Sequence, residues 1–233
     1  MKSIYEFLFS EHLLNEHLLK SKTAASTQSY DYVDLGLPSD LLWARCNIGA
    51  DEPTEYGDYF MWGSTEPNTN DDCGWKNCPF NNGHAVFHSS YFTSIKDKVC
   101  PNGILAAKYD AASVILGNDW RLPTKEDFEE LKDNTKNEWV ENYQDSKING
   151  MVFTPVGFEA NGGELGTELF IPASGFLHES RFYYLNADAY LWSSSLYASN
   201  TYYANNLHFD KYCDPKDISK RFYGFCLRAV KEK

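Results

Sequence analysis

The sequence has no long apolar run, and no segment approaches the roughly 20 apolar residues that a membrane-spanning helix needs. Basic residues are also scarce: 21 Lys and Arg stand against 33 Asp and Glu, a formal net charge of −12. A surface with this charge repels phosphate, so nucleic acid is not an expected partner. A secretory signal is missing too, because Glu6, Glu11, His12 and Glu16 interrupt the first apolar stretch. We therefore expect synthesis in the cytoplasm without a signal peptide.

Catalytic motifs are missing as well. The chain contains no G-x-S-x-G, no P-loop and no H-E-x-x-H, and its carboxylates are not spaced like a calcium-binding loop. Six cysteines in 233 residues are too few for a disulfide framework. The sequence therefore predicts a protein that is not an enzyme and that needs no cofactor.

One group of residues has ligand types that suit zinc. Cys73, Cys78, His84 and His88 form a C-x4-C-x5-H-x3-H pattern, and thiolates with imidazoles bind zinc tetrahedrally. The gap between the Cys pair and the His pair is shorter than in zinc fingers. Two thiols with two loop histidines, or a Cys73–Cys78 disulfide, are the favoured alternatives.

Three segments follow one another along the chain. Residues 1–22 are expected to form an amphipathic helix with a Ser3–Glu6 capping box, which anchors the protein to a larger assembly or oligomerises it. Residues 23–29 (TAASTQS) are a polar linker. Residues 30–233 form the main domain.

Short β-type runs alternate with Gly, Pro, Asn and Asp from residue 30 onward. Two helices are expected among them, one over residues 106–116 and one that begins after Thr124. A long polar loop is expected between about Glu66 and Asn102. The pattern predicts an α+β fold with many short, mostly antiparallel strands.

The aromatic residues are the most unusual feature of the composition, at 16% of the chain. Residues 183–233 are rich in Tyr, and their mixture with Asn, Ser and His is typical of protein surfaces that bind partners. An ordinary polar strand edge explains the composition about equally well. Strand alternation places Leu207 and Phe209 inward, with Asn206 and His208 outward. The candidate ligand-binding residues are Tyr197, Ser199, Asn200, Tyr202, Tyr203, Asn205, Asn206, His208 and Tyr212.

Five ordered motifs carry a family resemblance across residues 30–230. They are YDYVDLGLPSDLLWARCNIGADEPTEYGDYFMWGSTEP, NDWRLPTKEDFEELKDN, LFIPASGF, YLWSSS and RFYGFCLRAV. Together they resemble the Fibrobacter-type major paralogous domain, which is common in gut Bacteroidales and their phages. The resemblance implies a C-type-lectin-like fold, related to formylglycine-generating-enzyme-like folds and to the variable proteins of diversity-generating retroelements.

The resemblance also implies a function. A fixed scaffold would present a variable C-terminal surface to a protein or glycan ligand, displayed on a phage particle or a bacterial surface. The nine candidate residues would form that surface, and replacing Tyr202 and Tyr203 by Ala would leave stability nearly unchanged. Two alternatives remain: a formylglycine-generating-type or other thiol or metal enzyme with a reactive Cys226 or Cys213, and a purely structural virion component.

Overall fold

The two helices expected from the sequence are present in the computed structural model, which describes residues 31–68, 73–117, 119–156, 168–212 and 217–233. Helix α4 (Lys125–Asp133) begins with a capping box, because Thr124 and Asp127 each accept a hydrogen bond from the other's backbone N–H. Helix α3 (Ala111–Leu116) begins after Asp110, whose carboxylate accepts from the Ser113 N–H. It starts later than expected, because residues 107–109 form a separate 3-10 turn.

The expectation of one long loop between Glu66 and Asn102 is wrong. Helix α2 (Ser89–Val99) occupies its last third and buries Phe92 and Val99. The His88 ring accepts a hydrogen bond from the Tyr91 N–H and caps its first turn. The sequence SSYFTSIKDKV has a weak apolar periodicity, and its cap is a histidine rather than the usual Ser, Thr, Asp or Asn. For both reasons, this helix was not predicted from the sequence.

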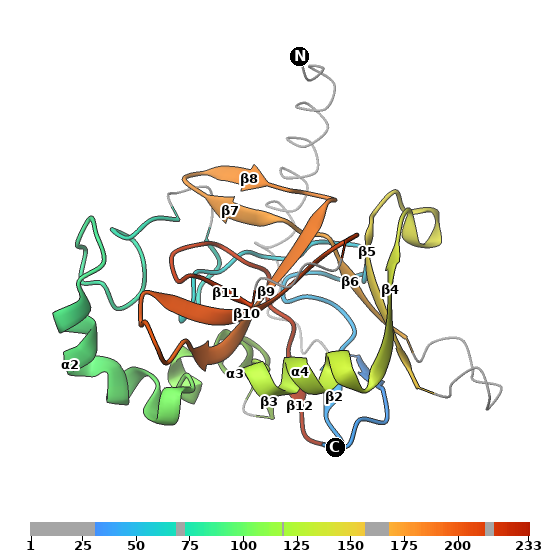
Figure 1. Cartoon of the computed structure of the whole chain (residues 1–233), viewed down its shortest axis with the longest axis horizontal. Helices are drawn as coiled ribbons and strands as arrows, with labels where there is room; N and C mark the ends of the chain where they lie inside the picture. The colour runs from blue at the N-terminus through green and yellow to red at the C-terminus, as the bar shows by residue number, and fades with distance from the viewer. Residues whose placement is uncertain (1–30, 69–72, 118, 157–167, 213–216) are drawn as a thin grey trace, which may run out of the picture.

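Within the described residues, antiparallel pairing joins the strands of each of four small sheets (Figure 1). The four-stranded sheet has the order β1 (Tyr32–Asp34), β2 (Leu42–Ala44), β12 (Val230–Lys231) and β3 (Trp120–Arg121). One three-stranded sheet contains β4 (Thr135–Val140), β5 (Gly150–Pro155) and β6 (Leu169–Pro172). The other contains β11 (Ile218–Lys220), β10 (Tyr203–Asp210) and β9 (Asp188–Leu196), and β7 (Phe176–His178) pairs with β8 (Arg181–Tyr183). The α+β class is therefore confirmed.

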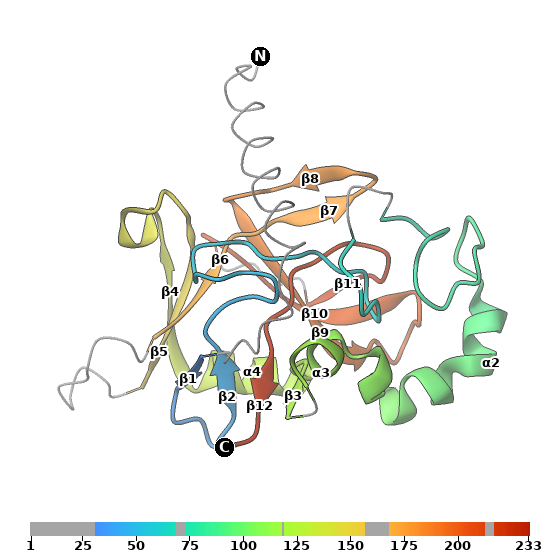
Figure 2. The same ribbon diagram turned by 180° about the vertical axis from the view of Figure 1, so that it is seen from behind.

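The two ends of the described chain meet in one sheet. Strand β12 pairs with β2 on one side and with β3 on the other, so the C-terminal end is inserted beside the first strands (Figure 2). Arg228, just before β12, fixes this closure, because its guanidinium donates to Asn47 Oδ1 and to the carbonyl oxygens of Ala44, Arg45 and Phe170.

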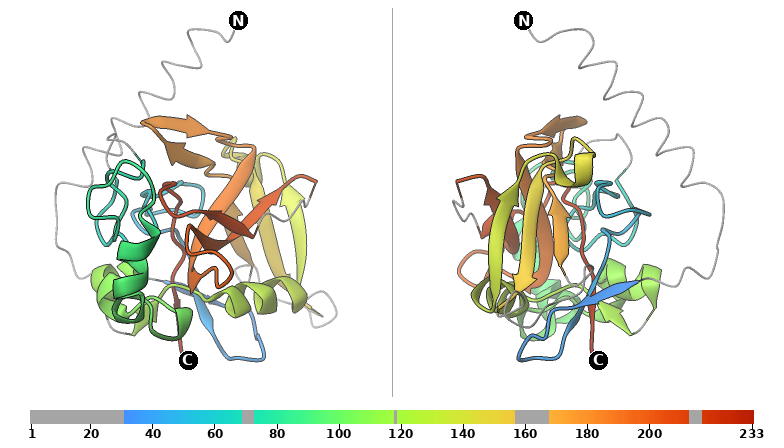
Figure 3. Two further views of the ribbon diagram at one scale, coloured as in Figure 1. Left: turned by 60° about the vertical axis from the view of Figure 1, so that its left-hand side comes forward. Right: turned by 90° about the vertical axis from the view of Figure 1, so that its right-hand side faces the viewer.

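Strand β9 lies in the middle of the fold, with β7 and β8 toward one end of the molecule and α4 toward the other (Figure 3). Its side chains alternate between two apolar clusters. Leu191 contributes to one cluster, together with Leu207 and Phe209 of β10, and Trp192 contributes to the other. The β9–β10 hairpin is therefore covered on both faces, and this decides which of its residues can reach a ligand.

None of the helices in the described ranges has the length and apolar character needed to cross a bilayer. The expected helix over residues 1–22 and the linker over residues 23–29 lie outside the described residues.

Candidate ligand-binding surface

The nine candidate residues separate into three groups along the β9–β10 hairpin. Five lie on the connecting segment between the strands or at its end, which we call the recognition loop (residues 197–203). Three lie inside β10, and Tyr212 follows the far end of β10. The loop residues are Tyr197, Ser199, Asn200, Tyr202 and Tyr203.

The three residues inside β10 do not face solvent. Asn205, Asn206 and His208 are 6%, 4% and 3% exposed, so the expected outward orientation of Asn206 and His208 is wrong. Leu207 and Phe209 do point into a core cluster, as the alternation predicts. The opposite face of the strand is covered as well, because α4 packs against β10 and the Tyr190 ring lies 4.4 Å from the His208 ring.

The recognition loop is tightly turned and its tip is exposed. The Tyr203 N–H donates to the Asn200 carbonyl at 3.0 Å, and the Tyr202 N–H donates to Asn200 Oδ1 at 3.0 Å. The side chains of Ser199 and Asn200 remain exposed, while those of Tyr197 and Tyr203 are half-buried. The tip therefore presents polar groups in a fixed backbone conformation.

Tyr202 connects the loop to the core. Its ring lies 4.6 Å from the Trp75 ring and 5.5 Å from the Phe87 ring, and Trp75 Nε1 donates to its hydroxyl at 3.2 Å. Buried Arg221 supports the same segment, because its Nε donates to the Thr201 carbonyl at 2.8 Å. Tyr202 therefore contributes both to the packing of the core and to the surface of the loop.

The structure changes the expected result for replacement of Tyr202. We predict that Tyr202→Ala destabilises the protein by about 2 kcal/mol, because it removes a ring that fills space between Trp75 and Phe87. Tyr203→Ala should cost about 0.5 kcal/mol, near the range of surface substitutions. Urea unfolding of the two variants measures the difference. Equal and small losses would contradict the packing role of Tyr202.

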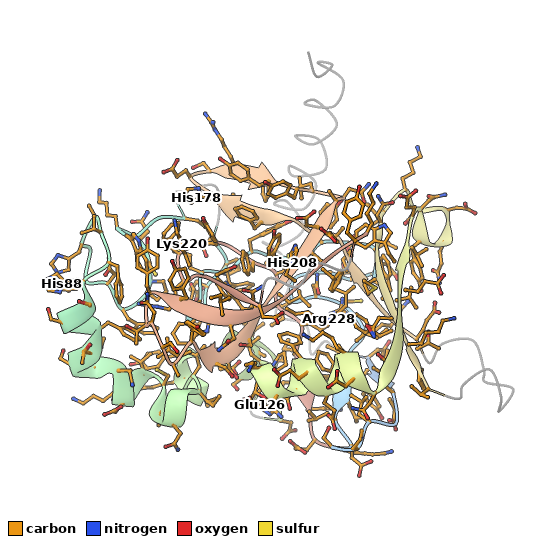
Figure 4. All side chains as sticks on the ribbon, in the orientation of Figure 1. His88, Glu126, His178, His208, Lys220 and Arg228 are labelled. Atoms are coloured by element: carbon orange, nitrogen blue, oxygen red, sulfur yellow. The ribbon has the colours of Figure 1, made fainter. Side chains whose placement is uncertain are left out.

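Lys220 borders the recognition loop and His178 lies beside Tyr223 next to it, and sequence reasoning missed both residues. Lys220 is the cross-strand partner of Tyr203, and its Nζ lies 5.9 Å from the Tyr202 ring centroid. The His178 ring lies 5.1 Å from the Tyr223 ring, and Lys220 Nζ lies 6.0 Å from the same ring. In Figure 4 both residues are labelled in the upper left of the view and His208, which is buried, is labelled nearer the centre. No local sequence signal marks either residue, since strand pairing between distant segments brings them to the loop.

We call the combined area the recognition surface. Its residues are Tyr197, Ser199, Asn200, Tyr202, Tyr203, His178 and Lys220.

The four predicted zinc ligands are not gathered into one group. Across the described ranges, no three or more His, Cys, Asp or Glu side chains form a group that could hold a metal ion. Cys73 and Cys78 are buried free thiols in an apolar cluster, so they form no disulfide with each other. The His84 and His88 rings stack on each other at 4.1 Å, and His88 caps α2.

Cys226, the residue that a thiol enzyme would use, lies in an apolar environment. It is fully buried, and this burial raises the pKa of its thiol to about 12. A reactive cysteine needs the opposite environment, one that is partly exposed and electropositive, because the thiolate is the nucleophile. Cys213, the other candidate for a reactive thiol, lies outside the described residues.

Tyr212 is highly exposed, at 76%, but it belongs to a different part of the surface from the recognition loop. It lines a separate cleft at the other end of the β9–β10 hairpin. The candidate residues therefore do not form one continuous surface.

Comparison of the chain with protein-family models, with curated proteins and with solved structures found no match.

Proposed function

We propose that this protein is a non-enzymatic binding protein with a C-type-lectin-like fold, and that its recognition surface binds a protein or glycan partner. The main support for the proposal is a difference in exposure along the β9–β10 hairpin. The tip residues Ser199 and Asn200 are exposed, whereas β9 is buried from Ala189 to Leu196. Binding residues are commonly found on loops that a rigid scaffold positions.

The chemistry of the recognition surface suits a macromolecular partner. Tyr197, Tyr202 and Tyr203 offer rigid rings with hydroxyl groups, and Ser199 and Asn200 offer adaptable hydrogen bonds. Lys220 and His178 add basic groups at the edge of an otherwise acidic protein. A partner with aromatic and acidic or hydroxyl groups would complement this combination.

Display on a phage particle or a bacterial surface, with residues 1–22 as the anchor, is part of the same proposal. So is diversification of the surface by a retroelement. The resemblance assigns seven residues between positions 192 and 228 to the fixed scaffold, and their burial supports this division: Trp192, Ser193, Ser194, Leu207, Phe209, Gly224 and Arg228. Variation would then be confined to residues 197–203, since substitutions at buried Asn205, Asn206 and His208 would disturb the fold.

A double substitution at the loop tip tests the proposal. We expect Ser199→Arg with Asn200→Arg to reduce binding of the fluorescently labelled protein to a panel of gut Bacteroidales cells by about tenfold or more, because two long charged side chains block the surface. Both side chains are exposed, and among the described residues the only side-chain contact that is lost is the hydrogen bond from the Tyr202 N–H to Asn200 Oδ1, so urea unfolding should change by about 1 kcal/mol or less.

Val114→Arg with Ile115→Arg is the matched control, because these side chains are also exposed but lie on α3. Equal loss of binding in both double variants would mean that added charge, rather than the loop, causes the effect. If the double loop variant binds the cells as well as the wild type does, the binding surface lies elsewhere and the proposal is contradicted.

A further inference from the structure

Residues 81–84 form a tight turn in the segment that leads to helix α2. The His84 N–H donates to the Asn81 carbonyl at 3.1 Å, and both central residues have a left-handed backbone, with a φ of 50° at Asn82 and of 71° at Gly83. Positive φ at both central positions is the mark of a type I′ turn, for which Asn-Gly is a preferred sequence. Both central residues are exposed, and no other described atom lies within 4 Å of where a Gly83 side chain would begin.

The two groups of this Asn-Gly pair that can react with each other are free. A β-turn uses the carbonyl of its first residue and the N–H of its fourth, so the N–H of Gly83, the third residue, is left over. Among the described residues, no hydrogen bond holds this N–H or the Asn82 side-chain amide. Glycine also has no Cβ that would obstruct its own nitrogen. The Gly83 nitrogen can therefore reach the Asn82 side-chain carbon through rotations within these two residues.

We propose that Asn82 is a site of spontaneous deamidation. The Gly83 nitrogen attacks the Asn82 side-chain carbonyl carbon, and the new C–N bond closes a five-membered succinimide ring. The C–N bond of the side-chain amide breaks, and ammonia leaves with the proton that the Gly83 nitrogen gives up. Water then adds to either carbonyl of the ring and opens it, which yields aspartate or isoaspartate. The product carries one additional negative charge at neutral pH.

A second Asn-Gly pair in the described ranges has the same two residues in a different turn. Residues 100–103 form this turn, in which Gly103 is the fourth residue and its N–H donates to the Cys100 carbonyl at 3.0 Å. That hydrogen bond must break before the nitrogen can attack Asn102. A backbone hydrogen bond of ordinary strength should slow the reaction by about twofold to tenfold.

The third pair, Asn149-Gly150, is held more firmly. The Asn149 side chain accepts from the Asn142 N–H at 3.0 Å and donates to the Asn186 carbonyl at 2.9 Å. Gly150 is a buried residue of β5. The side chain cannot turn toward the Gly150 nitrogen unless both hydrogen bonds break and the strand opens locally. We expect this pair to react more slowly than the pair in the exposed turn by about a hundredfold or more.

Deamidation changes the backbone beside a buried clamp. Asn81 is completely buried, and its side-chain nitrogen lies 2.7–3.0 Å from the carbonyl oxygens of Trp75, His84 and Val86. Isoaspartate at residue 82 adds one carbon atom to the backbone between Asn81 and His84, so it should disturb these hydrogen bonds. This consequence concerns packing, and it does not depend on the proposed binding function.

The experiment incubates the full chain in ¹⁸O-labelled water at neutral pH and assigns each conversion by peptide mapping with mass spectrometry. Labelled oxygen enters only the carboxyl groups that form during the incubation. We expect Asn82 to convert at least about twofold faster than Asn102 and about a hundredfold faster than Asn149. In urea the three pairs should convert at similar rates, because no fold restrains them. A fourth pair, Asn161-Gly162, lies outside the described residues, and peptide fragmentation distinguishes it from Asn149.

Asn82→Gly is the blocked variant, because Gly adopts the same positive φ but has no side-chain amide. It should lose the conversion at residue 82 and leave that at Asn102 unchanged. After incubation, amide hydrogen exchange over residues 75–88 should be faster in the wild type than in this variant, and equal exchange would contradict the effect on the clamp. Conversion of Asn102 or Asn149 as fast as Asn82 in the native chain would overturn the proposal. So would an unmodified native Asn82 after a time in which the chain in urea has converted completely.

Discussion

Replacement of Arg228 by Met should destabilise the protein by on the order of 3–5 kcal/mol. The side chain is completely buried, and its guanidinium donates four hydrogen bonds at 2.6–3.1 Å. Met fills a similar volume but donates none of them, and each buried acceptor left unpaired costs about 1–3 kcal/mol. Since these acceptors belong to the end of β2, to the segment after it and to β6, the loss releases the C-terminal end from the sheet that it closes.

Arg221 provides the matched comparison. It is equally buried, but its two terminal guanidinium nitrogens have no hydrogen-bond partner among the described residues. Its guanidinium carbon instead lies 4.1 Å from the Phe92 ring centroid and 5.3 Å from that of Phe87. Arg221→Met removes an imperfectly paired buried charge, so we expect a loss of about 2 kcal/mol or less.

Urea unfolding of the two Met variants beside the wild type measures both free energies. A larger loss at Arg221 than at Arg228 would contradict the argument that hydrogen bonds, and not burial alone, decide the contribution of each arginine. Arg228→Lys extends the comparison, because one ammonium cannot reproduce a planar fork that reaches acceptors on separate segments. It should therefore recover only part of the loss.

Local signals predicted the elements whose boundaries depend on nearby residues. The Thr124 cap and the acidic first turn placed α4, and Gly117, at a φ of 101°, ended α3 as expected. Helix α2 was missed because its stability comes from packing of Phe92 and Val99 against distant residues. Strand β11 is only three residues long and exists through its pairing with β10, which a local reading cannot detect.

The residue types of the candidate site could be predicted from the sequence, but their exposure to solvent could not. The alternation in β10 was correct, yet His208 is buried because Tyr190 and α4 cover the face that was expected to be free. Both faces of a strand can be buried, and only tertiary packing decides whether they are. Lys220 reaches the surface because β11 pairs with β10, and His178 lies near Tyr223 because Leu177 forms a bridge with Gly224. The cleft that Tyr212 lines together with Trp139 and Asp188 was not predictable for the same reason, since β4 and β9 are distant in sequence.

The reactivity of the buried thiols offers a test that distinguishes a binding protein from a thiol enzyme. Burial raises the pKa of Cys226 to about 12, from an ordinary value of 9.0, and that of Cys78 also to about 12. At pH 8 a thiol with a pKa near 12 is ionised to ~0.01%, against ~10% for an ordinary thiol, and only the thiolate reacts with alkylating reagents. Burial additionally restricts the approach of the reagent.

We therefore expect iodoacetamide to modify Cys226 at least about a thousandfold more slowly in the native protein than in urea at pH 8. Half-buried Cys46 is the internal control and should react faster than Cys226 in the same native sample. Site-resolved mass spectrometry measures both rates. The native rate at Cys226 should rise about tenfold per pH unit until the protein unfolds, because the thiolate fraction does so well below the pKa. A thiol enzyme requires the reverse order, so modification of Cys226 ahead of Cys46 would contradict the binding function and favour catalysis at this cysteine.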